Sequence, residues 1–185
     1  MVSAIPEGTR TITPHLIVKG ARKAIDFYAK AFGARELYHM DGPGGSIVHA
    51  ELQIGDSRLY LVDESPMGAG RAPQTLKGSS VAIHLFVPDV DASFQRAVGA
   101  GAKVTQPLMD MFWGDRFGQV SDPFGHIWSL ATHKEDVRPD EMARRGEEAM
   151  AAMASVSPKP AARKASRPAP KRRAPKKAAG RKRGR

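Results

Sequence analysis

His15-Leu16-Ile17-Val18 returns 69 residues later as His84-Leu85-Phe86-Val87, and this doubling decides the fold. Each copy has the β-branched and apolar residues of a strand and runs into a segment with helical apolar spacing. Each helical pattern stops at a glycine, Gly33 in the first copy and Gly101 in the second. Two similar units, each too small to bury its apolar face alone, must pack against each other or against a second chain. A cleft between them is a natural place for a small molecule.

The order of elements repeats as strand, helix and three strands, which predicts an α+β fold of paired βαβββ modules. In the first unit we expect a strand at 11–18, a helix at 21–32, a strand at 34–40 and a hairpin of 46–54 with 57–62. In the second unit we expect a strand at 80–87, a helix capped by Asp89 or Asp91, and strands at 103–108, 116–121 and 126–132.

The expected domain organisation follows from these units and from shifts in composition. Residues 1–10 form an N-terminal extension and residues 11–136 form the folded domain. Within that domain, module one covers about 11–64, a crossover or lid covers 65–79, and module two covers about 80–133. A C-terminal helix at 137–154 then leads into a disordered tail of Lys, Arg, Ala and Pro at 155–185.

The formal net charge of +10 is concentrated at the C-terminal end of the chain. Residues 156–185 hold 13 Lys and Arg and no acid, whereas residues 1–155 hold 16 basic and 19 acidic residues. Thirteen cations without aromatic residues favour contacts with phosphates over sequence-specific contacts with bases. Nonspecific nucleic-acid binding is therefore expected. A solubilising or membrane-surface tail is the alternative. The expected contacts are Lys159, Arg163, Lys164, Arg167, Lys171, Arg172, Arg173, Lys176, Lys177, Arg181, Lys182, Arg183 and Arg185.

Several classes of protein are excluded or disfavoured by composition. The chain has no cysteine, which excludes disulfides, thiolate nucleophiles and Cys-ligated metals. The first residues lack the apolar stretch of a signal peptide, and no apolar run reaches the roughly 18 residues of a membrane span. We therefore expect a cytoplasmic protein, nucleoid-associated if the tail binds DNA.

Five ordered stretches, at 12–18, 24–34, 49–57, 112–116 and 122–128, carry a family resemblance. The last two read Phe112-Trp113-Gly114-Asp115-Arg116 and Asp122-Pro123-Phe124-Gly125-His126-Ile127-Trp128. Together they resemble the vicinal-oxygen-chelate superfamily, which includes glyoxalase I, extradiol dioxygenases and bleomycin-resistance proteins, and within it the PhnB-like branch. The resemblance implies modules curled around a shared cleft, and a homodimer.

The resemblance also implies a divalent metal held by His and Glu from the first and last strands of each module. Those positions fall near Thr13, Tyr60, Ala82 and Ser129. Hydroxyl groups are weak neutral donors and alanine offers none, whereas divalent ions in such sites bind imidazole or carboxylate. No metal or other cofactor is therefore expected, which weakens an assignment to glyoxalase or dioxygenase. Activity as a lyase or oxidoreductase stays open.

His15 and His84 lie two residues beyond Thr13 and Ala82, so each shares a strand face with its neighbour. We expect both histidines to line the cleft and shape a ligand cavity. Two other readings remain open. One is a displaced metal site made of both histidines and one carboxylate such as Glu64, and the other is general acid–base use.

Trp113 and Arg116 are the remaining pocket candidates. A tryptophan at the rim can stack on a planar ligand, and an arginine can pair with an anionic group. The alternative is an Asp115–Arg116 brace with Trp113 at a dimer seam. The candidate pocket residues are therefore His15, His84, Tyr60, Ser129, Trp113 and Arg116, with catalytic residues unassigned.

Three functions are compatible with these observations. The first is a small-molecule-binding or enzymatic domain that carries a nucleic-acid-binding tail. The second is a dimeric scaffold whose tail makes it a nucleoid-associated protein. The third is a drug-sequestering resistance protein, which needs an apolar groove and no metal.

Overall fold

A computed structural model describes residues 2–68 and 70–156 of the chain. The basic residues expected to contact nucleic acid, from Lys159 to Arg185, lie outside these described residues. The elements of module one are β1 (His15–Val18), α1 (Ala21–Phe32), β2 (Arg35–Asp41), the 3-10 turn η1 (Pro43–Gly45), β3 (Ile47–Ile54) and β4 (Ser57–Asp63). The short helix α2 (Pro73–Leu76) follows, and then β5 (Ala82–Phe86), α3 (Val90–Gly99), β6 (Lys103–Asp110), β7 (Asp115–Ser121), β8 (Ile127–His133) and α4 (Pro139–Val156).

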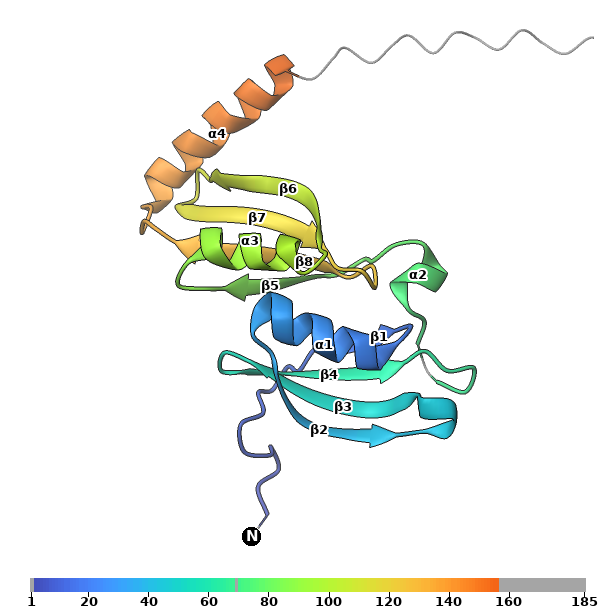
Figure 1. Cartoon of the computed structure of the whole chain (residues 1–185). Coiled ribbons are helices and arrows are strands. Elements are labelled where there is room, and N and C mark those ends of the chain that lie inside the picture. Colours follow the sequence, from blue (N-terminus) through green and yellow to red (C-terminus); the bar gives the residue numbers. More distant parts are fainter. Residues whose placement is uncertain (1, 69, 157–185) are drawn as a thin grey trace, which may run out of the picture.

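The expected fold class is confirmed, because each half of the domain is a βαβββ module with one four-stranded sheet (Figure 1). The strand order is β1-β4-β3-β2 in module one and β5-β8-β7-β6 in module two. In each sheet the first and last strands of the module run parallel and the other pairs are antiparallel. The register pairs His15 with Tyr60 and, in the same way, His84 with Ser129.

The start of each module helix is fixed by a side chain from the last strand of the same module. The Asp63 carboxylate accepts the backbone N–H groups of Gly20 and Ala21, at 2.7 and 2.9 Å, at the start of α1. Thr132, 69 residues later, accepts the N–H of Val90 at 2.9 Å at the start of α3. Free N–H groups at a helix start need such acceptors. The repeat in sequence is therefore also a repeat of capping contacts.

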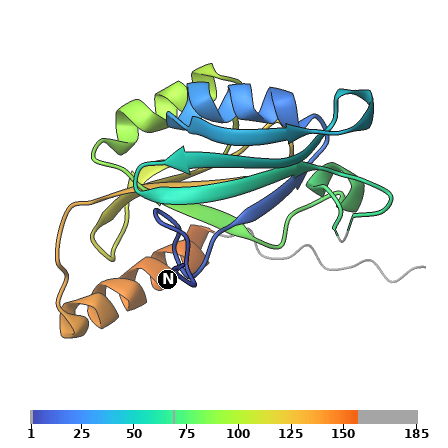
Figure 2. The ribbon, with the colours of Figure 1, turned by 90° about the horizontal axis from the view of Figure 1, so that it is seen from below.

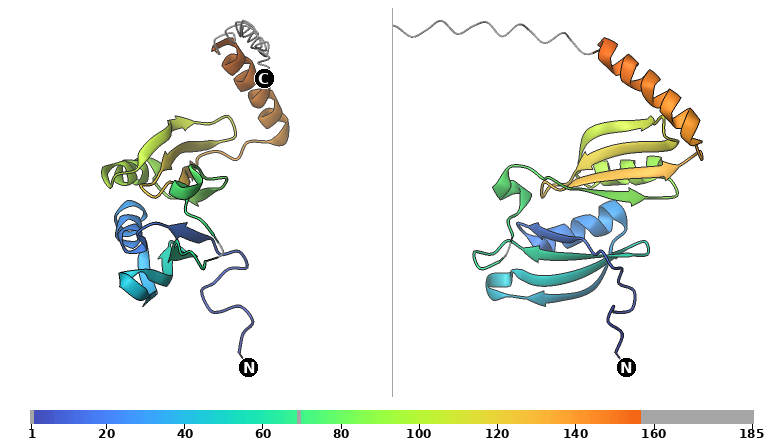
Figure 3. Two further views of the ribbon diagram at one scale, coloured as in Figure 1. Left: turned by 90° about the vertical axis from the view of Figure 1, so that its right-hand side faces the viewer. Right: turned by 180° about the vertical axis from the view of Figure 1, so that it is seen from behind.

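The two modules of the chain pack on each other through their helices. α1 and α3 lie side by side on one side of the molecule, and the N-terminal segment and α2 lie on the other (Figures 2 and 3). One apolar core runs through both modules. At its centre the ring of Trp128 lies 4.3 Å from that of Phe32 and 5.2 Å from that of Tyr28. The apolar face that neither unit can bury alone is thus covered within one chain.

A buried carboxylate, Asp122, links the modules by hydrogen bonds. It is 4% exposed and accepts from Tyr28 Oη at 2.8 Å and from Trp128 Nε1 at 2.9 Å. Its other oxygen accepts the backbone N–H groups of Phe124 and His126. Burial, and then the Asp122 charge, raise the pKa of Tyr28 well above its ordinary value. Asp122 thus joins α1 of module one to the β7–β8 turn of module two.

The element boundaries differ from expectation mainly at the edges of the modules. β1 begins at His15 and not at residue 11, because Pro14 has no N–H to donate to a neighbouring strand. The expected irregular segment between the modules contains the single turn α2. α4 extends away from module two (Figure 1). Of the helices within residues 2–68 and 70–156, none combines the length and apolar character needed to cross a bilayer.

Candidate functional site

Each sheet has one face packed on its helix and one face turned away from it. In β1 and β4 the buried side chains Leu16 and Leu61 pack towards α1, so their strand neighbours His15 and Tyr60 lie on the opposite face. We call this opposite face the open face of module one. It lies on the side of the molecule away from α1 and α3, where the N-terminal segment and α2 are found (Figure 3).

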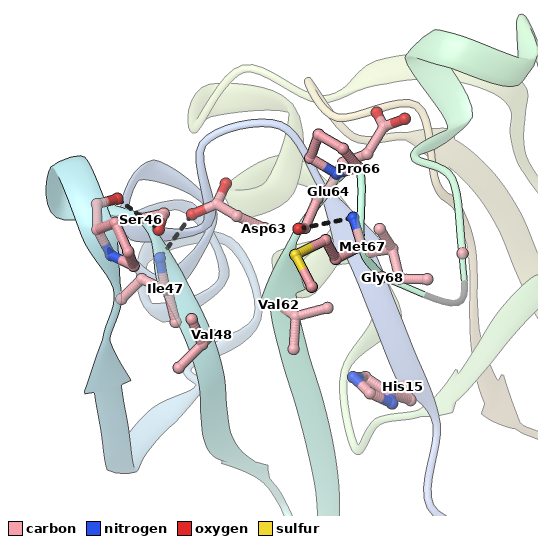
Figure 4. Close-up of a pocket in the computed structure, with 14 residues that line it drawn as sticks. His15, Ser46, Ile47, Val48, Val62, Asp63, Glu64, Pro66, Met67 and Gly68 are labelled. Carbon is pink, nitrogen blue, oxygen red and sulfur yellow. Dashed lines mark hydrogen bonds between the residues drawn. The ribbon is translucent and has the colours of Figure 1, made fainter.

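A cavity of about 700 Å³ lies on the open face of module one (Figure 4). Its walls come from His15 and Ile17 on β1, from Val62 and Asp63 on β4, and from Pro43, Ser46, Ile47 and Val48. The segment 64–68 and Gly70, which follow β4, complete the lining. We call this space the His15 cavity. A smaller cavity of about 250 Å³ lies between β1 and the start of module two, and His15 lines it as well.

His15 occupies the open face beside other aromatic rings. Its ring meets Tyr60 edge to face at 6.2 Å, and Tyr60 in turn lies 5.2 Å from His49. The imidazole of His15 makes no hydrogen bond to any residue in the described part of the chain. Partial burial, and then the proximity of His49, lower the pKa of His15 below its ordinary value. The lowered pKa favours the uncharged imidazole, which has one nitrogen that donates and one that accepts.

His84, the counterpart of His15 in module two, has different surroundings. Its ring lies 4.6 Å from Phe86 and 5.9 Å from Phe117. Its strand partner Ser129 is buried and accepts a hydrogen bond from Gln119 Nε2 at 3.2 Å. His84 lines neither of the two cavities that contain His15. The doubling predicts equivalent positions on the two sheets, but His15 lines the His15 cavity together with its partner strand β4 and His84 does not.

Arg116 and Trp113 are both engaged by carboxylates of the chain. Arg116 donates to both oxygens of Asp91 at 2.7 Å and to Asp110 at 3.3 Å. These contacts raise the pKa of Arg116 further and leave its charge compensated. Trp113 Nε1 donates to Asp115 at 3.0 Å. The Asp115–Arg116 brace does not form, because adjacent strand residues point to opposite faces.

Asp115 instead joins Trp113 to His133 at the end of β8. His133 Nδ1 lies 2.7 Å from an Asp115 oxygen and Nε2 lies 3.0 Å from an Asp136 oxygen, and both nitrogens donate when the ring is protonated. Hydrogen bonds to these two carboxylates, chiefly Asp115, raise the pKa of His133. Arg116 and Asp115 line a separate hollow of about 540 Å³ in module two, away from the His15 cavity. The six sequence candidates are therefore divided between the two modules.

The residues at and beside the positions that the superfamily resemblance assigns to metal ligands do not fit a divalent metal. The strand partners of Tyr60 and Ser129 are His15 and His84, whereas Thr13 precedes β1 and bonds to the Arg10 carbonyl. This set offers two imidazoles, one from each module, and no carboxylate. Within residues 2–68 and 70–156, no three His, Asp or Glu side chains gather closely enough to hold a metal ion. Divalent ions in proteins require such clusters of imidazole and carboxylate.

The chain belongs to the Glyoxalase/Bleomycin resistance protein/Dioxygenase superfamily, whose family model matches residues 11–130. The uncharacterized protein Rv0887c of Mycobacterium tuberculosis is 49% identical over 134 residues, which are 71% of this chain and 79% of that protein.

Solved structures show the same fold. TioX from Micromonospora sp. ML1 is 30% identical with a TM-score of 0.54, over 67% of this chain and 98% of that chain. A PhnB protein from Bacillus cereus, at 18% identity, has a TM-score of 0.53 over 66% of this chain and 99% of that chain. At this identity the second match concerns the fold alone.

Proposed function

We propose that this chain is a small-molecule-binding member of its superfamily that holds its ligand in the His15 cavity without a divalent metal. The proposal rests on the presence of the cavity itself. Its volume of about 700 Å³ falls within the usual range for organic ligands, and its lining is mainly apolar. Binding is favoured over the metal-dependent chemistry of the superfamily because the described residues supply no suitable donor set. A place in the PhnB-like branch is part of the proposal and rests on the motifs at 112–116 and 122–128.

A cavity-filling variant tests this function. Val62 lies on β4 and lines the His15 cavity, so Val62→Trp replaces the space with an indole ring. Val104→Trp is the matched control, because Val104 is a half-exposed β6 residue in module two. A library of small aromatic compounds is screened by thermal shift. A compound at about 100 times its Kd should stabilise the wild type by roughly 5–10 °C.

The two variants should give opposite results. Val104→Trp should respond to the same compounds as the wild type, and Val62→Trp should not. A compound that stabilises Val62→Trp as much as the wild type would contradict the proposal, because its site would then lie elsewhere.

We also propose that residues 156–185 bind nucleic acid without sequence preference. Thirteen cations and no acid in 30 residues support this function. If six cations met phosphates, the logarithm of affinity would fall with the logarithm of salt at a slope of about −5. The test is a full-length chain in which Lys171, Arg172, Arg173, Arg181, Lys182 and Arg183 are changed to Gln. Its control exchanges Lys and Arg at these six positions and so keeps the charge.

Binding to duplex DNA is then measured against salt concentration. The Gln variant should bind more weakly and with a shallower slope, and the charge-preserving control should match the wild type. Equal slopes for all three chains would contradict the proposal. If DNA binding depended on these residues and no small molecule bound, the protein would be a scaffold for its tail, nucleoid-associated in the cell.

We infer a homodimer as the assembly of this chain, as the superfamily resemblance implies. Phe86 at the end of β5 is 67% exposed, which supports a covered surface at this face of the sheet. A large apolar side chain exposed to this extent is typical of a surface that contacts another protein. Phe86→Asp should shift sedimentation from dimer to monomer. An unchanged dimer in this variant, or a monomeric wild type, would contradict the inference.

A further inference from the structure

Both carboxylates that line the His15 cavity are occupied by groups of the protein. Asp63 accepts three backbone N–H groups, two at the start of α1 and one from Ile47 at 2.8 Å (Figure 4). Glu64, whose side chain is 8% exposed, accepts from Thr75 Oγ1 at 2.6 Å and faces Arg71 at 3.4 Å and Lys19 at 3.7 Å. Neither carboxylate is left to serve as the counter-ion of a ligand.

The two serines that line the cavity are also hydrogen-bonded within the chain. Ser46 Oγ donates to the Pro43 carbonyl at 2.9 Å, and Ser65 Oγ accepts the N–H of Met67 at 3.3 Å. His15 is thus the one polar lining side chain that makes no hydrogen bond within the described residues. Its imidazole lies apart from the Asp63–Ile47 contact, towards the other end of the cavity (Figure 4).

No Lys or Arg lines the cavity, and the Lys19 and Arg71 side chains are paired with Glu64. An anionic ligand would therefore enter mainly apolar surroundings without a counter-charge. A cationic ligand would meet carboxylates already satisfied by the chain. Burying an unpaired charge is costly in either case. An uncharged ligand avoids both costs.

We propose that the ligand of the His15 cavity is an uncharged, largely apolar molecule whose hydroxyl group hydrogen-bonds to the His15 imidazole. This inference rests on the proposed function, because it takes the His15 cavity as the binding site. Tyr60 does not line the cavity, but its ring packs edge to face against the His15 ring from the neighbouring strand. The remainder of the ligand lies against Ile17, Val48 and Val62.

Four naphthalene probes of similar size separate the effect of ligand charge on binding from the effect of a hydrogen-bonding hydroxyl group. They are 2-naphthol, 2-methylnaphthalene, 2-naphthoate and 2-naphthylmethylamine, titrated into the full chain at pH 7.5 and followed by NMR. We expect 2-naphthol to bind most tightly and the two charged probes to bind at least about tenfold more weakly, since their charges would lose hydration without a partner.

Three histidine variants test the contact itself. His15→Phe should weaken the binding of 2-naphthol about fivefold, which corresponds to the net value of one hydrogen bond. The same variant should change the affinity for 2-methylnaphthalene less than about twofold. His15→Gln, which keeps a donor and an acceptor, should restore part of the loss. His84→Phe is the matched control, because it removes the equivalent histidine of module two and should change neither probe.

The outcomes distinguish this inference from the proposed function. If 2-naphthoate or 2-naphthylmethylamine binds as tightly as 2-naphthol, the inferred ligand class is wrong and the cavity remains a binding site. If His15→Phe weakens both uncharged probes equally, the hydrogen bond to His15 is wrong. If no probe binds, or all bind Val62→Trp unchanged, the cavity is not the site and the proposed function fails with the inference.

Discussion

At the scale of single residues, identical amino acids at repeated positions have different roles. His15 and His84 occupy equivalent places in their strands, but one lines a cavity and the other packs among phenylalanines. The sequence predicts that both lie on the open faces of their sheets, because strand periodicity requires it. It does not predict their neighbours, because the residues beside them differ between the modules: Tyr60 lies beside His15, and Phe86 and Phe117 lie beside His84. Arg116 is a similar case, since its partner Asp91 comes from α3, 25 residues earlier in the chain.

Tyr28 provides a test of the contact between modules. Tyr28→Phe removes one donor from buried Asp122, which keeps Trp128 and two backbone N–H groups. Hydrogen bonds to charged groups are worth about 1.5–3 kcal/mol, so the free energy of unfolding should fall by that amount. Denaturant unfolding measures it. Tyr38→Phe, at a half-exposed tyrosine of β2, should change it by less than about 0.5 kcal/mol. Equal losses in the two variants would contradict the role of Asp122.

Two histidines should give opposite pH dependence of stability. The pKa of His15 is lowered on folding, so the unfolded chain binds its proton first as pH falls below about 6.5. The stability of the folded chain should therefore fall as pH drops through that window, and His15→Phe should remove this loss. The pKa of His133 is raised by Asp115 and Asp136, so its contribution is present at low pH and is lost as pH rises through its folded pKa.

Denaturant midpoints of the wild type, His15→Phe and His133→Gln at pH 5.5 and pH 8 check both signs. At pH 5.5, His15→Phe should be more stable than the wild type and His133→Gln should be less stable. At pH 8, His133→Gln should be as stable as the wild type. Curves that change with pH in the same direction for both variants would contradict the assigned causes.

At the scale of elements, the periodic segments are predicted well and the irregular ones are not. The helical spacing of α1 and α3 and the glycine that ends α1 follow from local sequence, because helix packing and left-handed glycine are local properties. The capping of α1 by Asp63 is not predictable in the same way, since it joins residues 42 and 43 positions apart. α2 has only four residues and lies in a segment without apolar period.

Removal of the Asp63 carboxylate should destabilise the start of α1. Asp63→Ala leaves the first N–H groups of α1 and the N–H of Ile47 without their acceptor. The free energy of unfolding should fall by about 1–2 kcal/mol, the usual cost of losing a helix cap. Asp56→Ala, at an exposed turn, is the control and should cost less than about 0.5 kcal/mol. Denaturant unfolding of both variants checks the difference, and similar values would show that Asp63 does not hold the helix start.

At the scale of the whole molecule, the two modules differ in the chain that follows them. After β4 the chain folds back so that residues 64–68 and Gly70 lie over the open face of module one. After β8 it continues instead into α4, which extends away from module two (Figure 1). The sequence predicts the doubled fold because apolar periodicity repeats. It does not predict the His15 cavity of module one, because the segment after β4 that completes its lining has no counterpart after β8 and carries little periodic signal.

The most direct test of ligand binding in the His15 cavity is an NMR titration of the full chain with 2-naphthol in the presence of EDTA. Binding in the His15 cavity should cause chemical-shift changes in β1, in the start of β3, at the end of β4 and in residues 64–68, with no requirement for added metal. Changes centred on His84 and β5, or binding that occurs only after a divalent metal is added, would contradict it.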